Sequence, residues 1–300
     1  MDSSYRGRFA PSPTGPLHFG SLVAAVASYL DARSAGGEWL VRIEDLDPPR
    51  SVRGAASDIL QTLAACGMQW DGKVVCQRAH GDAYHAALHR LRARGFVYPC
   101  ACSRREIADS AVNRIEGPVY SGSCRDGLAP GKGARAWRIA TRGVTIAFDD
   151  AVQGRIGQDL ETAIGDFVLY RADRVYAYQL AVVIDDARQG ITDIVRGADL
   201  LDSTPRQVYL QQLLGLPTPR YCHVPVATNS AGEKLSKQTR AAPIDPGVPL
   251  PALLAALCFL GQRPPDDLAR ADVATLWQWA IANWRRGRVP RTRAIEWHEA

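Results

Sequence analysis

A stretch of fourteen residues near the start of the chain, from position 8 to position 21, constrains the fold more than any other segment. It reads Arg-Phe-Ala-Pro-Ser-Pro-Thr-Gly-Pro-Leu-His-Phe-Gly-Ser. Its prolines end a short apolar strand at 7–10, and the apolar run at 21–32 has helical composition. The segment therefore predicts a strand, a stiff turn and a helix whose first turn holds His18 and Gly20. Because a helix N-terminus attracts anions, we expect His18 to donate to a phosphate and Gly20 to admit a flat base.

Strands and helices alternate through the rest of the first half. A second strand at 39–43 ends in the acidic group that begins at Glu44, and helices are expected at 56–66 and 83–94. This order is typical of a parallel sheet covered by helices, so the expected fold class is α/β. Apolar residues make up 46% of the 300 positions, which is ordinary for globular chains and supplies a core.

Several classes of protein are excluded or disfavoured. No apolar run approaches the roughly 20 residues of a membrane-spanning helix, and no secretory signal follows the charged start. Seven cysteines, an odd number spread along the chain, fit a reducing compartment better than a disulfide scaffold. A net charge of +5 is compatible with a polyanionic partner without requiring one. We expect a cytoplasmic monomer with no membrane partner.

A second segment, at 232–239, carries lysines in a chain that otherwise uses arginine. Two of the four lysines, Lys234 and Lys237, lie here within Gly-Glu-Lys-Leu-Ser-Lys-Gln-Thr. Lysine is a compact, mobile charge that suits a phosphoryl group whose charge shifts during reaction. The alternative is a solvated loop with two incidental lysines. The functional interpretation requires this segment to meet the one around His18, so that together they bind a triphosphate.

These two segments resemble the paired signatures of the class I aminoacyl-tRNA synthetases. His-Phe-Gly-Ser at 18–21 is similar to the HIGH signature, and Lys-Leu-Ser-Lys-Gln at 234–238 is similar to the KMSKS loop. The flanking residues at 8–15 and 41–47 resemble the glutamyl branch, and the similarity extends from about Tyr5 to Thr239. The departures are Phe and Ser within the first signature and Gln238 at the end of the second. The resemblance implies ATP with Mg²⁺ as substrate, bound by His18, Gly20, Lys234 and Lys237, with His18 and Lys237 catalytic.

The resemblance also implies an architecture. We expect a Rossmann-like parallel-sheet catalytic domain with a zinc-binding insertion, a short helical C-terminal tail and no anticodon-binding domain. The expected boundaries are 1–99 and 134–240 for the two halves of the catalytic domain, 100–133 for the insertion and 241–300 for the tail.

The charges of glutamate predict what its pocket contains. Two carboxylates call for arginines and an ammonium group calls for an acid. Arg8, Glu44 and Arg196 each stand at the end of an expected strand, and the carboxyl ends of parallel strands face one crevice. The resemblance to the glutamyl branch assigns glutamate binding to Arg8, Ala10, Ser12, Glu44, Tyr178 and Arg196.

A cysteine-bearing segment interrupts the strand–helix pattern. Cys100 and Cys102 are one residue apart and Cys124 lies 22 positions further on, which suggests a structural metal site rather than buried free thiols. The residues alone leave the fourth ligand open among Tyr120, Asp126 and Tyr98. The family resemblance implies one structural Zn²⁺ held by Cys100, Cys102, Tyr120 and Cys124.

Length distinguishes between branches of the family. Only 61 residues follow Thr239, fewer than the helical anticodon-binding part of a full glutamyl-tRNA synthetase needs. The chain is therefore similar to the truncated paralogues that activate L-glutamate without tRNA. Those enzymes attach it to the queuosine base in the anticodon loop of tRNA(Asp). The alternatives are a compact synthetase that charges a tRNA 3′ end and a non-catalytic tRNA-binding paralogue.

The tail combines arginines with tryptophans. Five arginines between 285 and 293 are interleaved with Trp284 and Trp297. Such a pattern suits phosphate contacts and base stacking, and it equally suits a helix that buries tryptophan under a solvated basic face. The sequence leaves both interpretations open.

Overall fold

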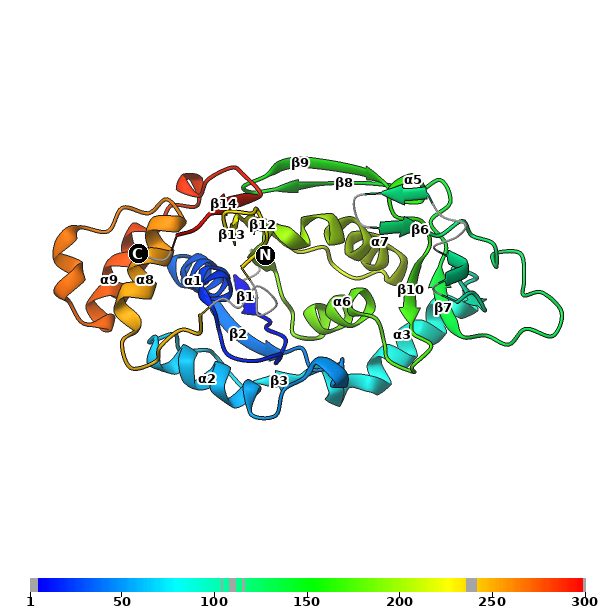
Figure 1. Ribbon diagram of the computed structural model, residues 1–300, viewed down its shortest axis with the longest axis horizontal. Helices are drawn as coiled ribbons and strands as arrows, with labels where there is room; N and C mark the ends of the chain where they lie inside the picture. Colours follow the sequence, from blue (N-terminus) through cyan, green and yellow to red (C-terminus); the bar gives the residue numbers. More distant parts are fainter. Residues whose placement is uncertain (1–4, 104, 108–111, 115–116, 236–241, 299–300) are drawn as a thin grey trace.

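A parallel sheet runs through the middle of the molecule (Figure 1). The computed structural model describes residues 5–103, 105–107, 112–114, 117–235 and 242–298. Strands β1 (Arg6–Phe9), β2 (Glu38–Ile43) and β3 (Val75–Cys76) pair in parallel, as do β11 (Asp193–Gly197) and β12 (Arg220–Val224). The Thr192 amide donates to the Arg6 carbonyl at 2.9 Å, which places β11 beside β1. The resulting order β3-β2-β1-β11-β12 is that of a Rossmann-like sheet, as predicted.

Helices cover this sheet on both sides. They are α1 (Phe19–Ser34), α2 (Ala55–Ala65), α3 (Gly81–Ala93), α6 (Tyr178–Arg188) and α7 (Thr204–Leu214). Helix α1 packs against β1 and β11 on one side and against the tail on the other, so it is buried on most faces. This position explains why the run at 21–32 has so few polar residues.

A second sheet is antiparallel and was not predicted. Strand β7 (Ala136–Ile139) lies between β4 (Val97–Cys100) and β10 (Phe167–Tyr170). The hairpin of β8 (Thr145–Asp150) and β9 (Gly154–Asp159) runs along one long edge of the molecule toward this sheet (Figure 1). Strand periodicity indicates a strand but not its partner or direction, which is why these pairings were missed. The remaining short elements are β5 (Val112–Arg114), β6 (Gly117–Val119), α5 (Leu160–Ala163) and the 3₁₀ turns 48–50, 77–80, 198–203, 266–270 and 286–288.

The tail joins the core of the first half. Helices α8 (Pro249–Phe259) and α9 (Val273–Asn283) pack on α1 and share one hydrophobic cluster with it. The tail is helical as predicted, except that it returns as strand β14 (Ala294–Glu296), which pairs in parallel with β13 (Val226–Thr228). None of the helices in the described part of the chain is long and apolar enough to cross a membrane.

A buried carboxylate ties the tail to α1. Asp31 accepts hydrogen bonds from Tyr5 Oη at 2.6 Å, Trp284 Nε1 at 3.0 Å and Arg286 Nη2 at 2.6 Å. The Asp31 side chain is only 3% exposed, whereas that of Arg286 is 38% exposed. Removing Asp31 would therefore leave the Trp284 indole and the Tyr5 hydroxyl without this hydrogen-bond partner in the core. It would also leave the half-buried Arg286 guanidinium without its counter-charge.

We expect Asp31→Ala to lower the free energy of unfolding by about 2–3 kcal/mol, because breaking a buried pair strands its partners. Urea denaturation measures this loss. The exposed pair of Arg155 and Asp149 is the control, and Asp149→Ala should change stability little. Equal losses in the two variants would contradict a structural role for Asp31.

Candidate active site and cysteine cluster

The two signature segments meet at the N-terminus of α1. A Cβ atom built on Gly20 would lie 3.2 Å from the Leu235 carbonyl oxygen, a contact that few side chains tolerate. The chain that follows the lysine segment also returns here, because the Ile244 amide donates to the Leu17 carbonyl at 2.9 Å. Glycine at position 20 thus permits a close approach of the lysine segment, whereas the sequence had suggested room for a nucleotide base.

His18 stands before the helix rather than within its first turn. It is the N-cap of α1, and its Nδ1 accepts a hydrogen bond from the Ser21 amide at 3.3 Å. Its Nε2 lies 2.9 Å from Ser21 Oγ. The imidazole is nearly buried, at 9% exposure. The serine that departs from the family signature therefore holds the histidine ring against its own helix.

Lys234 lies on the segment that follows β13. Its Nζ forms an ion pair with Asp199 Oδ2, just beyond the end of β11. Lys237 lies outside the described residues. The structure therefore places His18 and Gly20 at the start of α1, and Lys234 directly before the Leu235 carbonyl that meets Gly20.

A cavity of about 150 Å³ opens beside the carboxyl ends of β1 and β2. Three predicted glutamate-binding residues line it: Ser12, Glu44 and Tyr178. Charged side chains of both signs line it as well, namely Asp47, Arg50 and Arg171. Arg8, Ala10 and Arg196 are not among the lining residues.

A buried charge cluster fixes the strand ends beneath this cavity. Asp186 on α6 accepts from Arg42 Nη1 at 2.7 Å and from Arg8 Nε at 3.1 Å. Arg42 Nη2 also donates to Glu44 Oε1 at 3.2 Å. Burial raises the pKa of Asp186, but the charges of Arg42 and Arg8 outweigh it and hold that pKa below its usual value. For Glu44 the effect of burial is larger than that of the positive charges of Arg42 and Arg8, so its pKa is raised.

The cluster leaves part of Arg8 available. Its Nε and Nη2 are directed at Asp186, while Nη1 has no hydrogen-bond partner within the described part of the chain. Burial raises the pKa of Tyr178, and the positive charges of Arg196 and Arg8 oppose this.

A second buried chain of contacts holds Arg196. Its Nε donates to His223 Nε2 at 3.0 Å, and His223 Nδ1 lies 2.6 Å from Asp150 Oδ2. Thr204 Oγ1 and Gln207 Oε1 accept from Arg196 Nη2, each at 2.8 Å. Arg196 Nη1 reaches the Tyr178 hydroxyl at 3.5 Å. A neutral His223 that donates from Nδ1 and accepts at Nε2 satisfies both neighbours.

Sequence reasoning missed the residues that orient the predicted ones. Arg42 and Asp186 hold Arg8 and Glu44, and His223 holds Arg196. A charged residue inside the buried strand 39–43 and an Asp-Asp pair ending an apolar run were signals of buried pairing. No signal linked His223 to Asp150, because the two are 73 positions apart.

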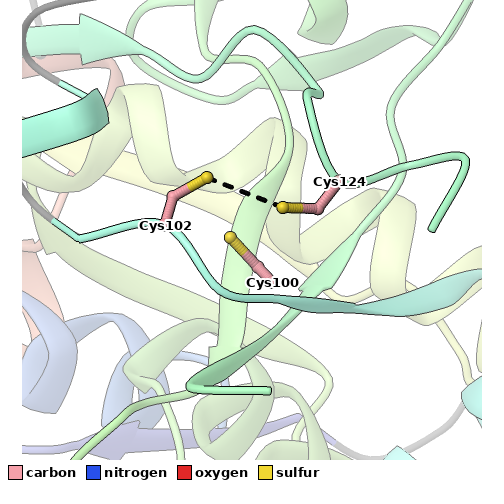
Figure 2. A group of neighbouring side chains, drawn as sticks. All are labelled: Cys100, Cys102 and Cys124. Atoms are coloured by element: carbon pink, nitrogen blue, oxygen red, sulfur yellow. Dashed lines mark hydrogen bonds between the residues drawn. The ribbon is translucent and has the colours of Figure 1, made fainter. Parts of the chain in front are cut away.

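Three cysteines converge in the insertion (Figure 2). The sulfur atoms of Cys100, Cys102 and Cys124 all lie within 4.8 Å of one another. The Tyr120 hydroxyl joins them, at 3.5 Å from Cys100 Sγ and 3.7 Å from Cys102 Sγ. The structure therefore brings together all four residues of the predicted metal site.

The donor set fits a tetrahedral zinc ion. Zn–S bonds of about 2.3 Å and a Zn–O bond of about 2.0 Å give S···S edges near 3.8 Å and S···O edges near 3.5 Å. Cys102 Sγ and Cys124 Sγ are 3.6 Å apart. Of the alternatives for the fourth ligand, Tyr98 donates its hydroxyl to Asp166, and Asp126 is exposed and outside the cluster.

The tail arginines are largely engaged within the protein. Arg286 pairs with Asp31, Arg293 pairs with Asp202, and Arg291 Nε donates to the Val152 carbonyl. Trp284 is buried and donates to Asp31. The structural interpretation of these residues thus gains support over the nucleic-acid one.

The buried His223 predicts a pH dependence of stability. Burial lowers its pKa from 6.5 to about 4, with the Arg196 charge acting in the same direction and Asp150 opposing it. The unfolded state therefore binds a proton between pH 6.5 and 4 that the folded state does not. Stability should fall by about 3 kcal/mol as the pH drops through that window.

Urea denaturation at several pH values between 7 and 4 measures this slope. We expect this fall in the free energy of unfolding between pH 6.5 and 4 to be smaller in His223→Gln by the part that His223 contributes, since glutamine does not titrate. The control is His85→Gln, because His85 is exposed and its Nδ1 lies 3.4 Å from the Tyr176 hydroxyl, which is a long hydrogen bond. An unchanged slope in His223→Gln would contradict the neutral buried imidazole.

Comparisons with known proteins identify the family. A model of the catalytic domain of class I tRNA synthetases (E and Q) matches residues 4–266. The glutamyl-Q tRNA(Asp) synthetase of Aromatoleum aromaticum is 60% identical over 292 residues, covering 97% of this chain and 92% of its own. That of Dechloromonas aromatica is 59% identical over 297 residues, covering 98% and 99%.

Solved structures agree in fold. A glutamate-tRNA synthetase from Elizabethkingia anophelis superposes with a TM-score of 0.80 at 23% identity, covering 99% of this chain and 68% of that one. A glutamate tRNA ligase from Elizabethkingia meningosepticum, solved with its amino acid, gives 0.79 at 23% identity, covering 97% and 66%. The chain therefore belongs to the class I aminoacyl-tRNA synthetases and, within them, to the glutamyl-Q tRNA(Asp) synthetase family of aminoacyl ligases.

Proposed function

We propose that this enzyme activates glutamate with ATP without tRNA, and then transfers the glutamyl group to queuosine in the anticodon loop of tRNA(Asp). The observations that carry the activation step are the meeting of Gly20 with Leu235 and a cavity lined by Glu44 and Tyr178 at the carboxyl ends of β1 and β2. The names of relatives at 55–60% identity support the choice of acceptor. We also propose that the protein acts as a monomer in the cytosol, where its seven free cysteines stay reduced.

The glutamate roles follow from charge. Arg8, through its remaining Nη1, and Arg196, through Nη1 beside Tyr178, bind the two carboxylates. Glu44 accepts from the ammonium group, which restores its ionised form where burial disfavours it. Ser12 and the backbone at Ala10 close the pocket along the turn after β1. Asp186 and His223 keep both arginines in place.

Activation is an in-line displacement. The α-carboxylate of glutamate attacks the α-phosphorus of ATP, a P–O bond forms as the bond to pyrophosphate breaks, and glutamyl-adenylate remains. The chain positions the reactants and stabilises charge without a protein nucleophile. His18 and Lys237 stabilise the charge that builds on the phosphates, while Gly20 and Lys234 complete the nucleotide site. Mg²⁺ bound with ATP offsets phosphate charge.

Transfer is an acyl substitution. A hydroxyl of the queuosine cyclopentene ring attacks the mixed anhydride, an ester forms, and AMP leaves with the bonding electrons. The alternative acceptor, a tRNA 3′ end, remains an outcome of the experiment below.

We further propose that the insertion holds one structural Zn²⁺ through Cys100, Cys102, Tyr120 and Cys124. Hydrogen bonds from Tyr120 and the Ala101 backbone overcome the effect of burial and lower the pKa of Cys124 to about 7, which favours the thiolate that binds metal. The ion would cross-link β4 to the loop that carries Cys124.

Two assays test the function. Glutamate-dependent exchange of pyrophosphate into ATP without tRNA measures activation. Transfer of radiolabelled glutamate to tRNA(Asp), with and without its queuosine, measures the acceptor. We expect exchange without tRNA and label only on the modified tRNA. Label on queuosine-free tRNA(Asp) would identify a 3′-end synthetase, and no exchange at all would identify a binding paralogue.

We predict that Lys237→Ala lowers the exchange rate by at least about 100-fold, because it removes a charge that stabilises the transition state. Thermal unfolding should be unchanged. Lys73→Ala, on the exposed turn before β3, is the matched control and should exchange as wild type does. A wild-type rate in Lys237→Ala would refute its role.

The zinc proposal predicts one bound ion per chain by elemental analysis. Cys124→Ser should lose the metal and lower the unfolding temperature, while Tyr120→Phe keeps three thiolates and should bind zinc about 10–100-fold more weakly. Cys258→Ser, on α8 and far from the cluster in sequence, is the control. Full metal content in Cys124→Ser would argue against the site.

A further inference from the structure

The half-buried Trp297, in the tail, lies on the first signature. Its ring stacks on that of Phe19, with the centroids 3.9 Å apart and the planes 12° from parallel. Phe259 on α8 meets both rings edge-on, at 5.7 Å from Phe19 and 6.2 Å from Trp297. Phe19 is the residue directly after His18 and the first of α1. Trp297 therefore packs directly against the residue that follows the histidine cap.

The same residue is bonded to the strand that leads into the lysine segment. The Trp297 amide donates to the Thr228 carbonyl at 2.8 Å, which extends the pairing of β14 with β13. On its other side Thr228 forms a bridge with Lys234, and the Leu235 amide donates to the Ala227 carbonyl at 2.8 Å. Strand β13 is thus held between the tail and the lysine segment.

We propose that Trp297 is a positioning residue for the nucleotide site, holding the His18 segment and the Lys234 segment in register. This inference rests on the proposed ATP-dependent activation. The Trp297 side chain contacts Phe19 in the first segment. Its backbone amide binds Thr228, which bridges to Lys234 in the second. A shift of β14 therefore moves the two segments relative to each other. The two segments already approach closely where Gly20 meets the Leu235 carbonyl, so their relative position depends on such a shift.

The glutamate pocket does not share this dependence. Its lining comes from the turns after β1 and β2 and from the segment before α6. Arg8 and Arg196 are held by Asp186 and His223, and the contacts that hold them do not involve the tail. Loss of Trp297 should therefore affect ATP and leave glutamate binding as it is.

The test measures exchange kinetics of full-length variants with ATP and with glutamate varied separately. We expect Trp297→Ala and Trp297→Leu to raise KM for ATP or lower kcat by about tenfold or more, since small misplacements of reacting groups are costly. KM for glutamate should stay within about twofold, and Trp297→Phe, which keeps a flat ring, should restore most of the activity. Trp279→Ala, which removes another half-buried tail tryptophan, is the matched control and should leave both constants unchanged.

Three results would overturn the proposal: an unchanged kcat and an unchanged KM for ATP in both Trp297→Ala and Trp297→Leu, an equal rise in both KM values, or the same defect in Trp279→Ala. Should Trp297→Ala fail to fold, Trp297→Leu decides, because leucine keeps apolar volume without a stacking face. If the wild type shows no exchange, the proposed function fails. In that case, calorimetric titration of ATP with Mg²⁺ into the same variants tests the positioning role. The role then requires a weaker affinity for ATP in Trp297→Ala and Trp297→Leu and an unchanged one in Trp279→Ala.

Discussion

Four charged side chains buried at the ends of β1, β2 and α6 hold the active-site half of this molecule together. Arg42 is fully buried, so its charge requires compensation, and Asp186 supplies it while also binding Arg8. Glu44 joins the same cluster from the end of β2. Because removing any one of these groups would strand another in a dry environment, the two strands and the helix are fixed relative to each other. The cavity beside these strand ends is therefore held in a fixed shape.

The proposed nucleotide site depends on a different kind of constraint, which is backbone contact between remote segments. Gly20 admits the Leu235 carbonyl, and β13 carries the lysine segment on one side and β14 on the other. The tail thus serves the site even though its arginines are mostly paired within the protein. The phenylalanine at position 19 of the first signature provides the flat ring on which Trp297 stacks.

The insertion adds a third unit, which the proposed zinc ion would hold together. Its hydrophobic cluster is small, consisting of Cys100, Tyr120 and Cys124 with a few half-buried neighbours. Such a core is too small to hold a loop of this length, which is the usual reason for a structural metal. Spacing alone identified the three cysteines, whereas the proximity of the tyrosine hydroxyl appears only in the fold.

The sequence by itself determined the strand–turn–helix start, the α/β class and three of the residues that line the cavity, Ser12, Glu44 and Tyr178. These follow from local signals: prolines that end a strand, an apolar helix, and charges placed where strands stop. Only the tertiary structure decided the antiparallel sheet, the return of β14, and the links from Asp186 and His223 to the arginines. Each of these depends on partners up to 178 positions apart, and local pattern carries no information about which distant group will satisfy a buried charge.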